Sequence, residues 1–151
     1  MNILVINGSP KGKYSITLQT MNYLMQKYPD HKFEVLDAGQ KTRSLERDFT
    51  PAADMIDKAD LLIFSYPVYT FIAPYQLHRF IELLKDSGMN LSGKFATQFS
   101  TSKNFSSLTS RHLPIQVLKY CVLPITQSHI TKIYYHIVRC HTRRLLHTMI
   151  I

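Results

Sequence analysis

Residues 1–17, MNILVINGSPKGKYSIT, contain the pattern that decides the fold. Residues 1–7 form a short apolar run, which Gly8-Ser9-Pro10 interrupts. Such a run is typical of a buried parallel strand that leaves its sheet into a loop. From residue 16 the spacing of the apolar residues predicts a helix that stops at Pro29-Asp30. Its apolar stripe comprises Ile16, Met21, Leu24, Met25 and Tyr28.

Three more strands are predicted further along the chain. Residues 32–37 alternate and end at Gly39, residues 61–64 are strongly apolar, and residues 94–99 precede a Ser/Thr cluster at 100–102. Residues 40–50 are polar and predict a loop.

Two helices separate these strands. One begins at Thr50-Pro51, with Thr50 as N-cap and an apolar stripe of Ala52, Met55, Ile56 and Ala59. The other begins at Pro74 and carries the stripe Leu77, Phe80, Ile81 and Leu84. The order βαβαβαβ predicts a parallel α/β sheet with helices on both faces. Ligands of such sheets bind beyond the carboxyl ends of the strands, so the loops after strands one, three and four are candidate sites.

Composition bounds the class of protein. The 151 residues, 45% hydrophobic and 19% charged, predict one globular domain over 1–151. No stretch approaches the roughly 18 apolar residues that span a bilayer, and the amino-terminal apolar run is too short for a signal peptide. We therefore expect a cytoplasmic protein without a membrane partner. Cys121 and Cys140 are too few for an iron–sulfur cluster, and we expect reduced thiols.

The last third of the chain differs from the rest. Of the 18 Lys/Arg and 10 Asp/Glu residues, ten of each lie in 1–86, which leaves eight bases and no acid in 87–151. Ile115–Val122 predicts a fifth strand, and an amphipathic helix is predicted from Ile130. Two interpretations remain open: a compact completion of the fold, or a tail read out of frame from about residue 104. A solvated helix face is favoured over a metal site at His136 and Cys140, and over a nucleic-acid surface.

The two best candidate loops have different chemistry. Residues 8–17 are not a Walker A loop or a GxGxxG motif, but they place glycines, hydroxyls and lysines at the start of a helix. Free N–H groups and the helix dipole at that position favour a phosphate, although an ordinary turn would use the same residues. Residues 65–74, SYPVYTFIAP, are aromatic and apolar, which suits either a flat ligand or a packed loop.

Taken together, GSPKG at 8–12, PVY at 67–69 and the helix after Pro74 resemble the flavodoxin-like NADPH-dependent FMN reductase and NAD(P)H oxidoreductase family. The resemblance covers about residues 1–105. It implies a flavodoxin-like three-layer fold with strand order 2-1-3-4. It also implies a first loop that wraps the FMN phosphate, and later loops that flank the isoalloxazine ring. The positions implied are Ser9, Lys11, Ser15, Ile16 and Thr17 for the phosphate, and Pro67, Val68, Tyr69, Thr70, Thr101 and Ser102 for the ring. Many relatives have Asn near position 16, where a backbone N–H of Ile16 can replace the side-chain contact.

The function implied by this resemblance is hydride transfer from NAD(P)H, through bound FMN, to a flavin, quinone or other small acceptor. Because a flavin carries the redox chemistry itself, we nominate no catalytic side chain and no metal. A homodimer is implied by resemblance alone. One alternative is a flavodoxin-type electron carrier. Such carriers resemble one another in being strongly acidic, whereas this chain has a formal net charge of +8, which disfavours this alternative. The other alternative is a remnant that binds no flavin.

Overall fold

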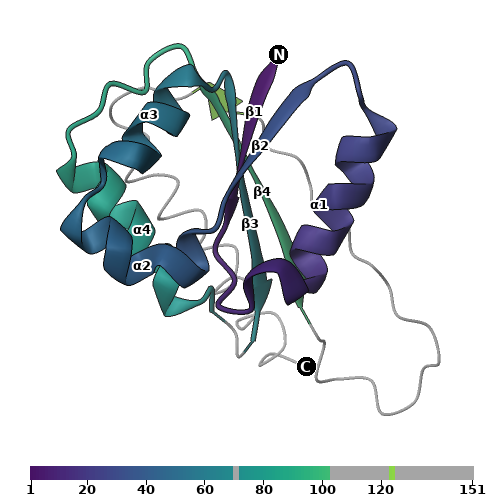
Figure 1. Ribbon diagram of the computed structural model, residues 1–151, viewed down its shortest axis with the longest axis horizontal. Helices are drawn as coiled ribbons and strands as arrows, with labels where there is room; N and C mark the ends of the chain where they lie inside the picture. Colours follow the sequence, from purple (N-terminus) through teal and green to yellow (C-terminus); the bar gives the residue numbers. More distant parts are fainter. Residues whose placement is uncertain (70–71, 103–122, 125–151) are drawn as a thin grey trace, which may run out of the picture.

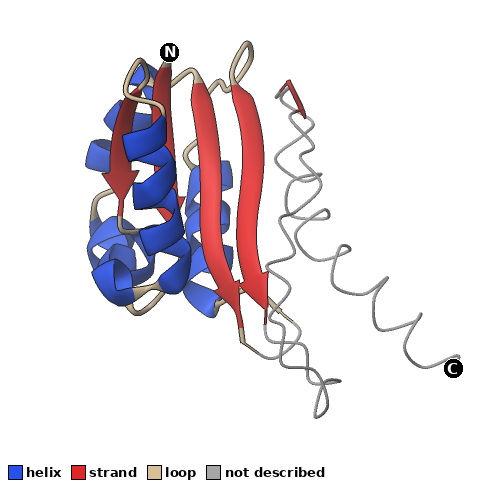
Figure 2. Cartoon of the chain, turned by 90° about the vertical axis from the view of Figure 1, so that its right-hand side faces the viewer, coloured by secondary structure: helices blue, strands red, loops and turns tan. Residues whose placement is uncertain are grey.

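The computed structural model describes residues 1–69, 72–102 and 123–124. In this part of the chain a β-sheet has helices on both faces (Figures 1 and 2). The elements in chain order are β1 (Asn2–Asn7), the 3-10 helix η1 (Gly12–Tyr14), α1 (Ile16–Lys27), β2 (Lys32–Leu36), α2 (Ala38–Arg47), α3 (Thr50–Lys58), β3 (Leu61–Val68), α4 (Tyr75–Asp86), β4 (Phe95–Ser102) and β5 (Leu123–Pro124).

The sheet has the order β2-β1-β3-β4-β5, and its first four strands are parallel. This confirms the predicted order 2-1-3-4 and the flavodoxin-like α/β fold. The short strand β5 pairs antiparallel with the start of β4, with Pro124 opposite Phe95. The strand predicted at 115–122 and the helix predicted from residue 130 lie outside the described residues.

The two faces of the sheet are covered unequally. Figure 1 shows α2, α3 and α4 on one side and α1 on the other. Side chains alternate across a strand, so Leu62, Phe64 and Tyr66 of β3 enter the larger core with α2, α3 and α4. Val5 of β1 and Phe99 of β4 belong to a smaller core beneath α1. The predicted stripe of α4 is fully confirmed, since Leu77, Phe80, Ile81 and Leu84 are all buried.

Helix α2 corrects the prediction that residues 40–50 form a loop. Its sequence, AGQKTRSLER, is polar except for a narrow face, where Ala38, Gly39 and Leu45 are buried. Strand β2 accordingly ends at Leu36, before Gly39. An ion pair with 2.7 Å between Arg79 Nε and Glu46 Oε1 then joins α4 to α2.

Two residues at helix starts also differ from prediction. Thr50 is the first residue of α3 rather than its N-cap, and its N–H donates to Asp48 Oδ1 at 3.0 Å. Hydrogen bonding to Thr50 lowers the pKa of Asp48 from its ordinary value. Ile16, predicted to lie in the core, is 70% exposed, because it begins α1 at the rim of the sheet. Tyr28 is also exposed, whereas Met21 is buried and Leu24 and Met25 are partly buried against the smaller core. No helix in the described ranges is long and apolar enough to cross a membrane.

The first turn of α2 packs directly against the loop that follows β1. A β-carbon built on Gly39 would lie 2.2 Å from the carbonyl oxygen of Ser9 and 2.4 Å from its carbonyl carbon. Both atoms are backbone, so they cannot move aside as a flexible side chain could. Gly39 is therefore the residue that lets helix and loop meet.

We expect Gly39→Ala to lower the free energy of unfolding by about 1 kcal/mol or more. Replacing glycine by alanine in a helix ordinarily gains about 0.5–1 kcal/mol, but overpacking against rigid atoms costs about 1–3 kcal/mol. Urea denaturation measures the difference. Ser44→Ala, at an exposed position of the same helix, is the control and should change little. A Gly39→Ala protein more stable than the parent would contradict the close contact.

Candidate functional site

The carboxyl ends of β1, β3 and β4 meet at one edge of the sheet. Asn7 is in register with Ser65, and Ser65 with Phe99. Strand β3 continues through Pro67 and Val68, which are paired with Thr101 and Ser102 at the end of β4. These four predicted ring positions are therefore strand residues rather than loop residues, and the structure brings them together.

Pro67 explains why β1 leaves the sheet where it does. The Gly8 N–H donates to the Ser65 carbonyl at 2.9 Å, the last bond of the β1–β3 ladder. In a regular parallel ladder the carbonyl of Gly8 would next accept from the N–H of residue 67, and proline has none. The chain therefore turns away at Gly8, and β3 continues with only β4 beside it.

The loop after β1 is folded on itself by short-range hydrogen bonds. The Gly12 N–H donates to the Ser9 carbonyl at 3.2 Å, and the Lys11 N–H to Ser9 Oγ at 3.3 Å. The N–H groups of Tyr14 and Ser15 donate to the carbonyls of Lys11 and Gly12 at 3.1 and 3.0 Å. These bonds occupy most of the N–H groups between residues 8 and 15.

The first turn of α1 contains hydrogen-bond donors that have no acceptor among the described residues. Among the described residues, no acceptor pairs with the N–H groups of Ile16, Thr17 or Leu18, as is usual for a helix start, and the turn contains no acidic residue. The hydroxyls of Ser15 and Thr17 lie 2.6 Å apart in a buried pair. One hydrogen bond between two hydroxyls leaves one proton still able to donate. Three N–H groups and one O–H group thus converge on this turn.

The charge and exposure of this loop vary from residue to residue. Ser9, Ser15 and Thr17 are buried, whereas Lys11, Lys13 and Ile16 face solvent. The Lys13 ammonium lies 5.2 Å from the centroid of the Tyr14 ring. The exposed rim of the loop is therefore cationic and apolar, with hydroxyls beneath it.

The segment after β3 presents aromatic and apolar surface at the same edge of the sheet. Val68 is buried, Tyr69 is 52% exposed, and Ile72 and Tyr75 are also exposed. Thr70, a predicted ring contact, lies outside the described residues. Thr101 is half-buried beside Pro67, whereas nothing is described of the Ser102 side chain. The Ser65 Oγ atom is buried and has no hydrogen-bond partner among the described residues.

Four residues at this edge were missed in the sequence. Asn7 is fully buried, and its side chain bonds the loop and Asp37 at the start of α2. Gly39 contacts Ser9, and the side chain of Gln40 lies over Gly12, whose φ is +52°. Asp37, Gly39 and Gln40 belong to residues 37–40, for which the sequence predicted the end of a strand and the start of a loop. The isolated Gly39 was the available signal, because a close backbone approach requires glycine.

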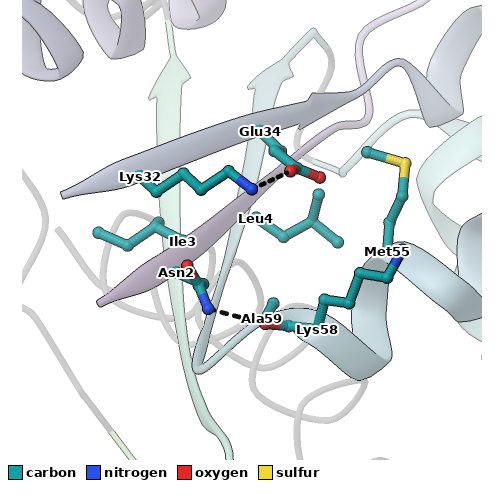
Figure 3. A pocket seen from close by; sticks show the side chains of 8 residues that line it. All are labelled: Asn2, Ile3, Leu4, Lys32, Glu34, Met55, Lys58 and Ala59. Atoms are coloured by element: carbon teal, nitrogen blue, oxygen red, sulfur yellow. Dashed lines mark hydrogen bonds and ion pairs between the residues drawn. The ribbon is translucent and has the colours of Figure 1, made fainter.

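A separate cavity of about 180 Å³ lies at the opposite, amino-terminal edge of the sheet. Figure 3 shows its lining, in which Lys32 points to Glu34 and Asn2 to the backbone of Lys58. The ion pair measures 3.2 Å, and Asn2 Nδ2 donates to the Lys58 carbonyl at 3.3 Å. Because these polar groups pair with one another, and because ligands of parallel sheets bind at the carboxyl edge, we place the candidate site at the loops instead.

Solved structures share this fold at low sequence identity. An NADH:FMN oxidoreductase in its apo form is similar at 23% identity, with a TM-score of 0.56 over 68% of this chain and 59% of the other. The NAD(P)H:quinone oxidoreductase of Methanothermobacter marburgensis is similar at 16% identity, with a TM-score of 0.53 over 68% and 64%. The Trp repressor binding protein of Bacillus subtilis matches at 19% identity and a TM-score of 0.51, over 92% and 76%. The chain thus spans less than two thirds of the first two proteins.

Comparison with curated protein sequences gives no match. The sequence model of one protein family does match, over residues 1–130. The match includes both candidate loops and the Pro67–Thr101 pair, and it extends beyond residue 105. This match agrees with the parallel sheet and with the loops gathered at its carboxyl edge. The chain belongs to the NADPH-dependent FMN reductase family, a family of oxidoreductases.

Proposed function

We propose that this chain binds FMN at the carboxyl edge of its sheet and transfers hydride from NAD(P)H, through the flavin, to a small acceptor. The observation that carries the proposal is the convergence of unpaired donors on the first turn of α1, at the same edge of the sheet as the exposed ring of Tyr69. The unpaired donors suit a phosphate, and the aromatic ring suits a planar ligand. Membership of an FMN reductase family supports a ligand that has both groups.

The phosphate would lie at the first turn of α1. The N–H groups of Ile16 and Thr17 would donate to it, together with the spare proton of the Ser15–Thr17 pair. Lys11, which is exposed, would supply positive charge from the rim. Ser9 would contribute through its hydroxyl proton, because its oxygen accepts from the Lys11 N–H. A helix start with no acid in its first turn presents an unopposed positive dipole end, which favours a phosphate dianion.

The flavin ring would lie against the ends of β3 and β4. Val68 and Tyr69 would form an apolar and aromatic wall, and Pro67 and Thr101 would form the floor. The hydroxyl of Thr101 would donate to a polar atom of the ring. The role of the protein is to orient the ring, exclude water from one side of it and supply hydrogen-bond donors.

When bound at this edge, FMN would supply the redox chemistry between NAD(P)H and the acceptor. No side chain of this chain is assigned a proton-transfer role. The exposed aromatic residues near the ring, Tyr69 and Tyr75, offer planar surface on which a nicotinamide or a small acceptor could stack. We therefore expect the acceptor to be small and planar.

Purification of the protein, with added FMN if needed, tests the proposal. We expect yellow protein that contains FMN and oxidises NADH or NADPH in the presence of a quinone or free flavin. Yellow protein that is inert to both nucleotides would indicate an electron carrier instead. Colourless protein that FMN cannot reconstitute would overturn the proposal.

Ile16→Glu should weaken FMN binding roughly tenfold without harming the fold. Ile16 is 70% exposed and begins α1, so a carboxylate there should stabilise the helix by about 0.3–1 kcal/mol while it repels a phosphate. Ile16→Gln, which has nearly the same shape and no charge, is the matched control. Flavin fluorescence titrations with FMN and riboflavin measure the effect. Riboflavin affinity should not change, and equal FMN affinity in both variants would place the phosphate elsewhere.

Tyr69→Ala should weaken FMN and riboflavin binding to the same extent, by about twofold to tenfold. Aromatic contacts of this kind contribute about 0.5–1.5 kcal/mol, and both ligands carry the same ring. Tyr23→Ala, which removes an equally exposed tyrosine from α1, is the control and should bind as the parent does. The ring lies away from Tyr69 if the Tyr69 variant behaves like the Tyr23 variant.

A further inference from the structure

Asn7, the last residue of β1, is fully buried and makes three hydrogen bonds through its side chain. Its Nδ2 atom donates to the Gly12 carbonyl at 3.2 Å and to Asp37 Oδ1 at 2.8 Å. Its Oδ1 atom accepts from the Ser9 N–H at 3.2 Å. A primary amide has two N–H protons and one oxygen, so both protons are used.

The chemistry of these partners fixes the orientation of the Asn7 amide. Turning it over would place its oxygen against the Gly12 carbonyl and the Asp37 carboxylate, neither of which can donate. It would also place an NH₂ group against the Ser9 N–H, where two donors would face each other. Only one arrangement satisfies the three partners.

These bonds hold both ends of one tight turn. Ser9 and Gly12 are already joined by the bond from the Gly12 N–H to the Ser9 carbonyl. Asn7 binds the N–H of Ser9 and the carbonyl of Gly12, which also accepts from the Ser15 N–H, so one side chain closes the turn from the inside. Because η1 begins at Gly12 and α1 follows η1 at Ile16, the position of this turn sets where α1 begins.

The third bond ties the turn to α2 in a way that departs from usual capping. Asp37 is the N-cap residue of α2, where aspartate normally accepts from the N–H groups of the first turn. Here its side chain makes no capping bond, and Oδ1 accepts from Asn7 instead. The Asp37 side chain therefore makes the bond to Asn7 in place of a helix-capping bond.

We propose that Asn7 is a positioning residue for the flavin phosphate. It does not contact the phosphate, but it holds the Ser9–Gly12 turn and, through Asp37, α2, so that the first turn of α1 presents its donors. This inference rests on the proposed function, since it concerns the same site.

Titrations of FMN and riboflavin into four proteins test it: the parent, Asn7→Ala, Asn2→Ala and the double variant Asn7→Asp with Asp37→Asn. Asn7→Ala removes three hydrogen bonds without changing the net charge. Asn2→Ala removes an asparagine bond from the other end of β1 and is the matched control. The double variant keeps the net charge and restores the bond between positions 7 and 37 with donor and acceptor exchanged. It also leaves an acceptor for the Ser9 N–H, but a carboxylate oxygen then faces the Gly12 carbonyl, so only two of the three hydrogen bonds are restored.

We expect Asn7→Ala to raise the dissociation constant of FMN about tenfold or more and that of riboflavin less than about threefold. The double variant, which keeps two of the three bonds, should bind FMN more tightly than Asn7→Ala, and Asn2→Ala should match the parent. Equal losses for FMN and riboflavin would indicate general loosening and overturn the assignment, as would parent-like FMN affinity in Asn7→Ala.

Circular dichroism of each protein shows whether it is folded. If Asn7→Ala does not fold, the double variant decides the matter, since a loss of affinity confined to FMN would support the proposal and equal losses for FMN and riboflavin would contradict it. A parent protein that binds no FMN would instead refute the proposed function, so the two failures are distinguishable.

Discussion

The loop between β1 and α1 cannot shift independently of α2, because Gly39 leaves no space for a β-carbon beside the Ser9 carbonyl. Much of the edge of the sheet depends on this contact. Helix α2 is in turn held to α4 by the Arg79–Glu46 ion pair, and Leu77 of α4 fits against Gly8, where a β-carbon would lie 2.9 Å from its Cβ. The loop is therefore in close contact with both α2 and α4, which lie on one face of the sheet.

The same loop crosses to the opposite face before α1 begins. Helices α2 and α4 contact the loop from the larger core, whereas α1 packs over the smaller core with Leu18 and Met21 (Figure 1). The unpaired N–H groups of α1 thus come from one layer and the residues that fix the loop from the other. The buried contacts that hold the loop and the unpaired donors of α1 therefore lie on opposite faces of the sheet.

The sequence predicted the architecture well because the four parallel strands are short, each has an apolar or alternating pattern, and Gly and Pro signals separate several of them from the helices. The prediction of α2 failed because only three of its residues are buried, so its mostly polar sequence was interpreted as a loop. Strand ends were also missed, since Ser65 to Val68 and Ser100 to Ser102 lack alternation, and they become strand only by pairing with each other. The phosphate and ring positions came from a resemblance, whereas Asn7 and Asp37 could not have been found, because their bond spans 30 residues and arises only in the folded sheet.

Pro67 has a consequence for the uniqueness of this fold. A parallel pair of apolar strands can slide by two residues and keep the same side chains on the same face, so hydrophobic pattern alone does not forbid the shifted pairing. Sliding β1 further along β3 would demand ladder bonds from residue 67, and proline cannot donate one. A residue at the rim of the candidate site therefore also opposes register slippage, so replacing it could allow alternative pairings even if the ring surface itself were preserved.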